Sequence, residues 1–220
     1  MARLKLGVLI SGRGSNLQAL IDAAADPSYP AEIAIVISDR PEAAGLERAA
    51  RAGIAHRAIP HPSREAFAAA AAAALRQSGA ELVALAGYMR ILDGDFVAAW
   101  RDRLVNIHPS LLPAFPGLHP QRQALAAGVR FSGCTVHFVR AEVDNGPIIA
   151  QAVVPVHPDD DEEVLSARIL TVEHRLYPMT VRLFAEGRLR VAGTIVAIAG
   201  ATPPENAMLN PAERLVSAGG

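Results

Sequence analysis

The stretch LKLGVLISGRGSNLQALI, residues 4–21, decides the fold of this chain. Its first segment, Leu4 to Ile10, is mostly aliphatic and does not alternate with polar residues, which is typical of a strand buried on both faces. A glycine-rich loop, Ser11 to Asn16, follows directly, and apolar residues then recur at helical spacing from Leu17 to Ile21. Strand, glycine loop and helix in this order predict an α/β unit whose helix start offers backbone N–H groups to an anion.

The glycine loop differs from the two common nucleotide-binding patterns. A G-x-G-x-x-G loop would need a glycine where Leu17 stands, and no Gly-Lys-Ser/Thr follows as in a P-loop. We therefore expect the loop to bind a phosphate group rather than a dinucleotide, with Ser15 and Asn16 capping the helix. A tight strand-to-helix turn without a ligand accounts for the same residues equally well.

The rest of the chain alternates predicted strands with predicted helices. Strands are expected at 31–38, 55–59, 81–86, 104–108, 132–139, 148–156 and, as a last pair, within 190–200. Helices are expected from Asp39-Arg40-Pro41 to Gly53, at 64–77 after a Ser63 cap, and at 93–100, 121–127 and 159–185, with a loose tail over 201–220. This order predicts a Rossmann-like, doubly wound, mostly parallel sheet with an antiparallel C-terminal hairpin.

The bulk composition excludes several classes of protein. Hydrophobic residues make up 51% of the 220, enough for a large core, and the 20% of charged residues is too low for disorder. A net charge of −1 gives no basic field for nucleic acid. The single cysteine, Cys134, is expected to be a small buried residue, and no His/Cys cluster suggests a metal. No stretch approaches the roughly 20 apolar residues of a membrane span, so we expect a cytoplasmic enzyme or binding protein without membrane partners.

The candidate catalytic residues lie in Asn106-Ile107-His108-Pro109-Ser110-Leu111-Leu112-Pro113. Asn106 and His108 share one strand face, and the prolines end the strand, where an open α/β sheet forms its ligand crevice. Histidine can exchange protons near pH 7, and asparagine can donate to an oxyanion. A lone histidine at a strand end is more often structural, but a candidate carboxylate, Asp144, follows in a turn-rich segment. This combination favours a catalytic site.

Four segments together, residues 10–19, 87–92, 106–113 and 144–147, resemble the phosphoribosylglycinamide formyltransferases, which are folate-dependent enzymes of purine biosynthesis. The resemblance implies the formyltransferase fold and transfer of a formyl group from 10-formyltetrahydrofolate to the amine of glycinamide ribonucleotide. The products would be formylglycinamide ribonucleotide and tetrahydrofolate. It also implies a catalytic domain over 1–190, in which residues 1–100 bind phosphate and the remainder binds folate, followed by a strand pair and tail over 191–220. A monomer or homodimer is expected.

The resemblance also implies roles for individual residues. Asn106 and His108 would donate to the formyl oxygen, while Asp144 would stabilise protonated His108 and relay the amine proton toward N10. Thr135 could order a water for that relay or be a plain strand residue, and His137 and His174 are expected to be structural. The ribonucleotide would contact Gly14, Ser15, Asn16 and Glu173. The folate would contact Arg64, Met89, Arg90, Ile91, Leu92, Asn106, Arg140, Ala141, Glu142, Val143 and Asp144.

Two other functions use some of the same residues. A formyltetrahydrofolate hydrolase would use the catalytic residues with water as acceptor, and the phosphate loop argues against it. A nucleotide-binding module would explain the loop but not Asn106, His108 and Asp144 together. Relatives with an extra N-terminal regulatory or C-terminal tRNA-binding domain are not expected. Asn145 stands where the family often has glycine, and asparagine tolerates positive φ well.

Overall fold

The structure is a computed structural model that describes residues 2–60, 62–202, 204–205 and 208–210. Its strands are β1 (Leu4–Ile10), β2 (Ala31–Ser38), β3 (His56–Ala58), β4 (Leu82–Leu85), β5 (Leu104–His108), β6 (Phe131–Phe138), β7 (Ile148–Pro155), β8 (Leu189–Ala192) and β9 (Ile195–Ile198). Its helices are α1 (Ser15–Ala24), α2 (Ala44–Arg51), α3 (Arg64–Gln77), α4 (Gly94–Ala99), α5 (Pro120–Ala126) and α6 (Glu162–Ala185).

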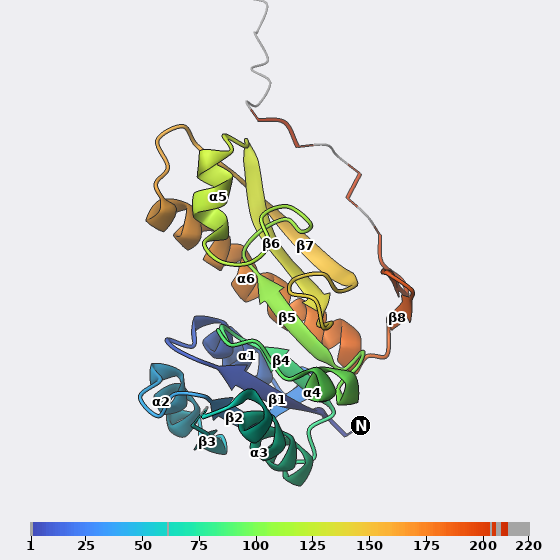
Figure 1. The fold of residues 1–220 in the computed structure, drawn as a ribbon. Coiled ribbons are helices and arrows are strands. Elements are labelled where there is room, and N and C mark those ends of the chain that lie inside the picture. The colour runs from blue at the N-terminus through green and yellow to red at the C-terminus, as the bar shows by residue number, and fades with distance from the viewer. Residues whose placement is uncertain (1, 61, 203, 206–207, 211–220) are drawn as a thin grey trace, which may run out of the picture.

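These strands form one sheet in the order β3-β2-β1-β4-β5-β6-β7-β9-β8 (Figure 1). Strands β1 to β5 are mutually parallel, whereas β6 runs antiparallel to β5 and β7 antiparallel to β6. The β8–β9 hairpin joins β7 only through the pair Ile148 and Ile195. The predicted doubly wound sheet with antiparallel C-terminal strands is therefore confirmed, and so is the last strand pair.

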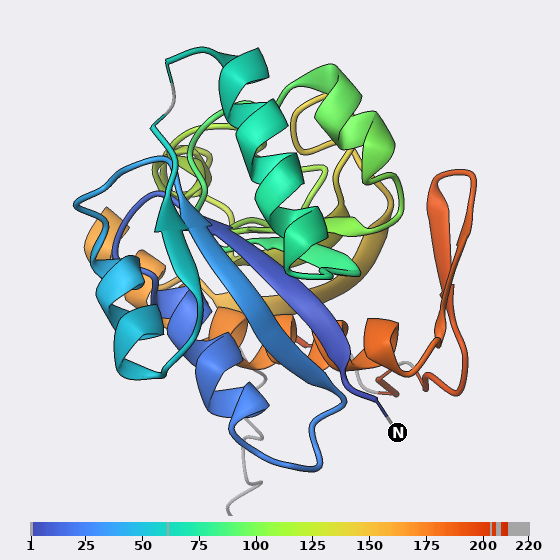
Figure 2. The same cartoon turned by 90° about the horizontal axis from the view of Figure 1, so that it is seen from below.

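Helices cover both faces of the sheet. Figure 2 shows α3 and α4 on one face and α1, α2 and α6 on the other, and two separate apolar clusters fill the two interfaces. Tyr177 of α6 is fully buried, and its hydroxyl donates to the carbonyl oxygens of Leu85 and Val105 at 3.0 and 3.2 Å. Because these carbonyls belong to β4 and β5, this hydroxyl fixes α6 against the centre of the sheet.

The starts of three helices agree only partly with the prediction. Ser63 caps α3, since its hydroxyl accepts from the N–H of Ala66 at 3.1 Å. The prediction that α2 begins at Asp39-Arg40-Pro41 is wrong, because residues 40–43 form a turn and α2 begins at Ala44. The capping prediction for Ser15 and Asn16 is also wrong. Gly14, at φ 70°, takes the N-cap position of α1, and no side chain caps it.

Two further predictions concern the single cysteine and the C-terminal tail. Cys134 is buried, as expected for a small apolar residue. The expected tail falls mostly on residues 203, 206–207 and 211–220, which lie outside the described residues.

The sheet brings the predicted site segments to one edge. The chain leaves β1 for β2 on one side and later returns as β4 on the other, which is the topological switch point where α/β sheets bind ligands. The loops after β1, β4 and β5 leave the same edge because these strands are parallel. The loops after β1 and β4 also touch, since Ser11 N–H donates to the Gly87 carbonyl at 3.1 Å and Met89 N–H donates to the Ser11 hydroxyl at 2.9 Å.

Candidate active site

The structure brings the three candidate catalytic residues together. Asn106 and His108 lie at the end of β5, and the turn after β6 folds back to carry Asp144 toward them. His108 Nδ1 lies 3.3 Å from Asp144 Oδ2, and both side chains are more than nine-tenths buried. A carboxylate held this way fixes the orientation of the ring. The pairing connects residues from different elements, so the sequence alone could not establish it.

Two backbone features hold Asp144 in place. Asp144 itself adopts φ 53°, and the N–H of Gly117 donates to its Oδ2 at 2.8 Å. Gly146 approaches β6 so closely that an added Cβ would lie 1.6 Å from the Phe138 carbonyl oxygen. Asn145 stands where the family often has glycine, but the residue at positive φ is the preceding one, Asp144. Asn145 instead donates from its side chain to Glu142.

The loop before α5 closes over the His108 ring. His108 Nε2 lies 3.0 Å from the carbonyl oxygen of Phe115, a residue at φ 55°. Because a carbonyl oxygen only accepts, this contact requires a proton on Nε2. His108 therefore has a donor on the side of the ring away from Asp144.

Thr135 supports the site through its hydroxyl. It is fully buried opposite His108 in the β5–β6 register. Its hydroxyl donates to the Ser110 carbonyl at 2.7 Å and accepts from Leu112 N–H at 3.0 Å and Gln151 Nε2 at 2.9 Å. Since a hydroxyl offers one donor and two lone pairs, these contacts use all of its capacity. Thr135 thus holds the turn after β5, which favours the structural role over the water-ordering one.

The glycine loop is held by α2. Gly14 lies against Gly45, and a Cβ on Gly14 would stand 2.8 Å from the Gly45 Cα. Gly45 N–H donates to the Gly12 carbonyl at 3.0 Å, and Arg48 Nε donates to the Arg13 carbonyl at 2.9 Å. These contacts fix the loop while the first N–H groups of α1 point out of the helix end, as at an anion site.

Asn16 and Glu173 form a buried pair beside this loop. The Asn16 side-chain amide donates to Glu173 Oε2 at 2.9 Å, which joins α1 to α6. Burial raises the pKa of Glu173 to about 7, and the Asn16 hydrogen bond only partly offsets that effect. Asn16 Oδ1 is buried and has no hydrogen-bond partner among the described residues, which leaves an acceptor for a ligand. The structure therefore brings these two predicted ribonucleotide residues together.

Most of the predicted folate residues lie in two segments, the loop after β4 and the turn after β6. Met89, Ile91 and Val143 are large apolar side chains with more than half of their surface exposed. Arg90 pairs with Asp39 at 3.4 Å, and Arg140 pairs with Asp102. Arg64 is exposed at the first residue of α3. One turn further along, the ring of Phe67 stacks on Tyr88 at a centroid distance of 5.4 Å, so this end of α3 adjoins the 87–92 loop.

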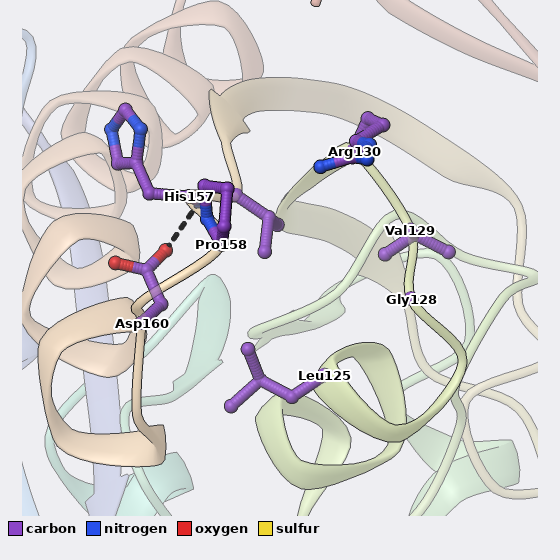
Figure 3. A pocket seen from close by; sticks show the side chains of 8 residues that line it. Leu125, Gly128, Val129, Arg130, His157, Pro158 and Asp160 are labelled. Carbon is purple, nitrogen blue, oxygen red and sulfur yellow. Dashed lines mark hydrogen bonds between the residues drawn. The ribbon is translucent and has the colours of Figure 1, made fainter.

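Two surface hollows are lined by other residues, and the first adjoins the glycine loop through Arg48. One, of ≈ 320 Å³, is lined by Gln18, Arg48, Arg51 and Ala52. The other, of ≈ 170 Å³, lies between α5 and the β7–α6 connection (Figure 3). Figure 3 shows Asp160 beside the His157 backbone, to which it is hydrogen-bonded at 2.8 Å. Neither hollow is lined by a predicted site residue.

The described residues were also searched for metal-binding groups and for helices that could span a membrane. Within the described residues, no group of three or more His, Cys, Asp or Glu side chains could hold a metal ion. In the same part of the chain, no helix is long and apolar enough to cross a membrane.

The fold and the motifs at its switch point are those expected of a formyltransferase, and comparison with known proteins gives the same class. The sequence model of the formyl transferase family matches residues 4–181, so this chain belongs to the formyl transferase family. A phosphoribosylglycinamide formyltransferase from Escherichia coli is 46% identical over 191 residues, covering 86% of this chain and 90% of that protein. The trifunctional purine biosynthetic protein adenosine-3 of Drosophila pseudoobscura pseudoobscura is 54% identical over 193 residues, but the chain spans 14% of its length.

Solved structures give the same picture. A glycinamide ribonucleotide transformylase 1 from Symbiobacterium toebii superimposes with a TM-score of 0.87 at 55% identity, covering 89% of this chain and 94% of that one. A formyltetrahydrofolate deformylase from Burkholderia mallei also matches, with a TM-score of 0.82 at 33% identity, covering 90% of this chain and 70% of that one. The fold is therefore shared by a transferase and a hydrolase, and the acceptor site must distinguish them.

Proposed function

We propose that this chain transfers the formyl group of 10-formyltetrahydrofolate to the amine of glycinamide ribonucleotide, in de novo purine biosynthesis. The observation that carries the proposal is the buried His108–Asp144 pair next to Asn106, at the same sheet edge as the glycine loop. The names of the relatives support the same reaction.

In this proposal the acceptor binds between α1 and α6. The N–H groups near Gly14 and Ser15 hold the phosphate, and Asn16 with Glu173 contacts the remainder of the ribonucleotide. The 2.9 Å contact between Asn16 and Glu173 supports this, because it forms a polar floor beside the loop. A hydrolase would have no need of such a floor.

The formyl donor binds against the 87–92 loop and the 140–144 turn. The exposed side chains of Met89, Ile91 and Val143 fit an aromatic co-substrate, because stacking a ring there buries apolar surface. Arg64, Arg90 and Arg140 are cations suited to the acidic end of a folate, although Arg90 is already paired with Asp39 and Arg140 with Asp102. The other proposed contacts are Leu92, Asn106, Ala141, Glu142 and Asp144.

The chemistry is acyl transfer. The ribonucleotide amine attacks the formyl carbon, and negative charge develops on the formyl oxygen. Asn106 and the Nε2–H of His108 donate to that oxygen, and each such donor is worth roughly 10²–10³ in rate. Asp144 orients His108 and takes a proton from the attacking amine. When the tetrahedral intermediate collapses, the bond between the formyl carbon and N10 breaks, and this proton passes to N10 to give tetrahydrofolate.

The test is consumption of 10-formyltetrahydrofolate with and without glycinamide ribonucleotide. We expect turnover that requires the ribonucleotide and falls at least about a hundredfold in Asp144→Asn, as for loss of a group that acts in the transition state. Asp159→Asn, at an exposed position outside the site, is the matched control. Full activity of Asp144→Asn would refute the assigned role.

A second candidate, hydrolysis of the same donor, is favoured by the likeness to a deformylase. It predicts equal turnover without the ribonucleotide, so the same assay separates the two reactions.

The proposal extends to organisation and setting. Residues 1–100 would hold the phosphate, the remainder of 1–190 the folate and reacting groups, and 191–220 would form a C-terminal strand pair and tail. The protein would act in the cytoplasm as a monomer or homodimer. Light scattering at several protein concentrations tests the oligomeric state.

A further inference from the structure

His137 lies directly behind Asn106. The two residues are paired in the β5–β6 register, and the His137 ring is 2% exposed. Its Nδ1 lies 3.0 Å from the Phe138 carbonyl oxygen, and its Nε2 lies 3.3 Å from Asn106 Nδ2. Nε2 is also 3.7 Å from Asp144 Oδ1, which is too far for a good hydrogen bond. The ring is thus hydrogen-bonded to Asn106 and lies near the carboxylate of Asp144 without a hydrogen bond to it.

These contacts determine where the proton of His137 lies. The Phe138 carbonyl can only accept, so Nδ1 carries the hydrogen, and in the neutral ring Nε2 then holds a lone pair. That lone pair accepts from the amide of Asn106. The amide nitrogen must therefore face His137, because the amide oxygen would set two lone pairs against each other. One N–H of Asn106 is used in this bond, and the other remains for an oxygen in the site.

We propose that His137 is a positioning residue, whose neutral Nδ1–H tautomer orients the Asn106 amide so that its second N–H meets the formyl oxygen. This inference rests on the proposed acyl transfer, but it concerns a residue to which that mechanism gives no part. The same tautomer leaves Nε2 without a proton to offer Asp144. His108 therefore has no competitor for the carboxylate.

The surroundings favour the neutral ring. Burial lowers the pKa of His137 below its usual value, and nearby His108 and Arg140 act in the same direction, whereas the Phe138 carbonyl and Asp144 oppose them. Protonation would place a donor on Nε2, repel the Asn106 N–H and attract Asp144. The activity of the wild-type protein should therefore fall at acidic pH. There His137 becomes protonated and no longer orients the amide of Asn106.

Kinetics of three variants test the proposal. His137→Leu should lower kcat to the level of Asn106→Ala, a loss of about a hundredfold or more, with the KM for the ribonucleotide changed by less than about twofold. The double variant should be no slower than Asn106→Ala alone, since both changes remove the same interaction. His137→Gln should recover most of kcat, because its amide oxygen can accept where Nε2 does. His157→Leu, at an exposed position, is the control.

Additive losses in the double variant, or a raised KM with normal kcat, would overturn the proposal, because either would indicate a role independent of Asn106. If wild type turns over without the ribonucleotide, the acceptor assignment fails while the coupling between Asn106 and His137 can still be measured with water as acceptor. ¹⁵N NMR of the ring at pH 7 gives a readout without activity. The expected signals are a protonated Nδ1 and an unprotonated Nε2, and the opposite tautomer would refute the proposal.

Discussion

The buried carboxyl of Glu173 makes the stability of this protein depend on pH. Burial raises its pKa from 4.5 to about 7. The folded state therefore favours the protonated form, and the stability associated with that proton is present below pH 4.5 and lost as pH rises through about 7. A pKa raised this far corresponds to a cost of about 3 kcal/mol above pH 7.

The substitution Glu173→Gln removes this cost while keeping an oxygen that can accept from Asn16 Nδ2. In urea denaturation, the variant should gain about 2–3 kcal/mol of unfolding free energy relative to wild type on going from pH 5 to pH 8. The affinity of the variant for glycinamide ribonucleotide should fall. A carboxylate offers two acceptor oxygens, whereas the glutamine amide offers only one, which Asn16 already occupies.

The control is Glu42→Gln, which changes an exposed carboxyl and should show no such pH-dependent gain. A stability difference between wild type and Glu173→Gln that is the same at pH 5 and pH 8 would refute the reasoning. It would mean that the carboxyl titrates alike in the folded and unfolded chains.

Three further substitutions test the support around the site. Thr135→Val leaves Leu112 N–H and the Ser110 carbonyl without their partner, at about 1–3 kcal/mol each, so urea denaturation should show a clear loss that Thr135→Ser largely restores. Gly146→Ala places a Cβ 1.6 Å from the Phe138 carbonyl oxygen, so the 140–147 turn must shift. We expect a large loss of kcat with only a small decrease in the melting temperature, and an unchanged kcat would contradict this. Tyr177→Phe removes the hydroxyl between β4 and β5 and should cost about 1 kcal/mol in unfolding free energy with kcat unchanged, whereas a large loss of kcat would assign the hydroxyl a role in the site.

Periodicity and turn chemistry were sufficient to predict the architecture. The runs that became β1 and β2 are continuous and aliphatic, and their bounds agree with the prediction. The start of α2 was wrong because Pro41 suits a turn as well as a first helical turn, and the choice depends on Gly45 contacting the glycine loop. Gly14 rather than a polar residue caps α1 for a similar reason, since its approach to Gly45 leaves no room for a side chain.

The sequence also indicated the residues at the strand ends, but not what faces them. Asn106 and His108 stand out because polar residues at the end of a buried apolar strand usually have a hydrogen-bond partner or a ligand. Phe115 and Gly117 gave no signal, because they contribute only a carbonyl and an N–H. Their contact with His108 and Asp144 depends on the path of a loop, which no local pattern predicts.

The antiparallel strand β6 explains why the supporting residues were harder to recognise than the reacting ones. Thr135 and His137 share one face of β6 and lie opposite His108 and Asn106, so two polar pairs stand side by side across β5 and β6. Alternation shows that Thr135 and His137 share a face, but it does not show whether a hydroxyl or ring is available to a ligand. The register decides this. It sets Thr135 against the turn at Ser110 and Leu112, where its bonding capacity is used up, and sets His137 against the amide of Asn106, where one lone pair fixes the orientation of a donor. The groups proposed to react therefore lie on the strand that continues the parallel sheet, and the residues that contact them lie on the reversed strand beside it.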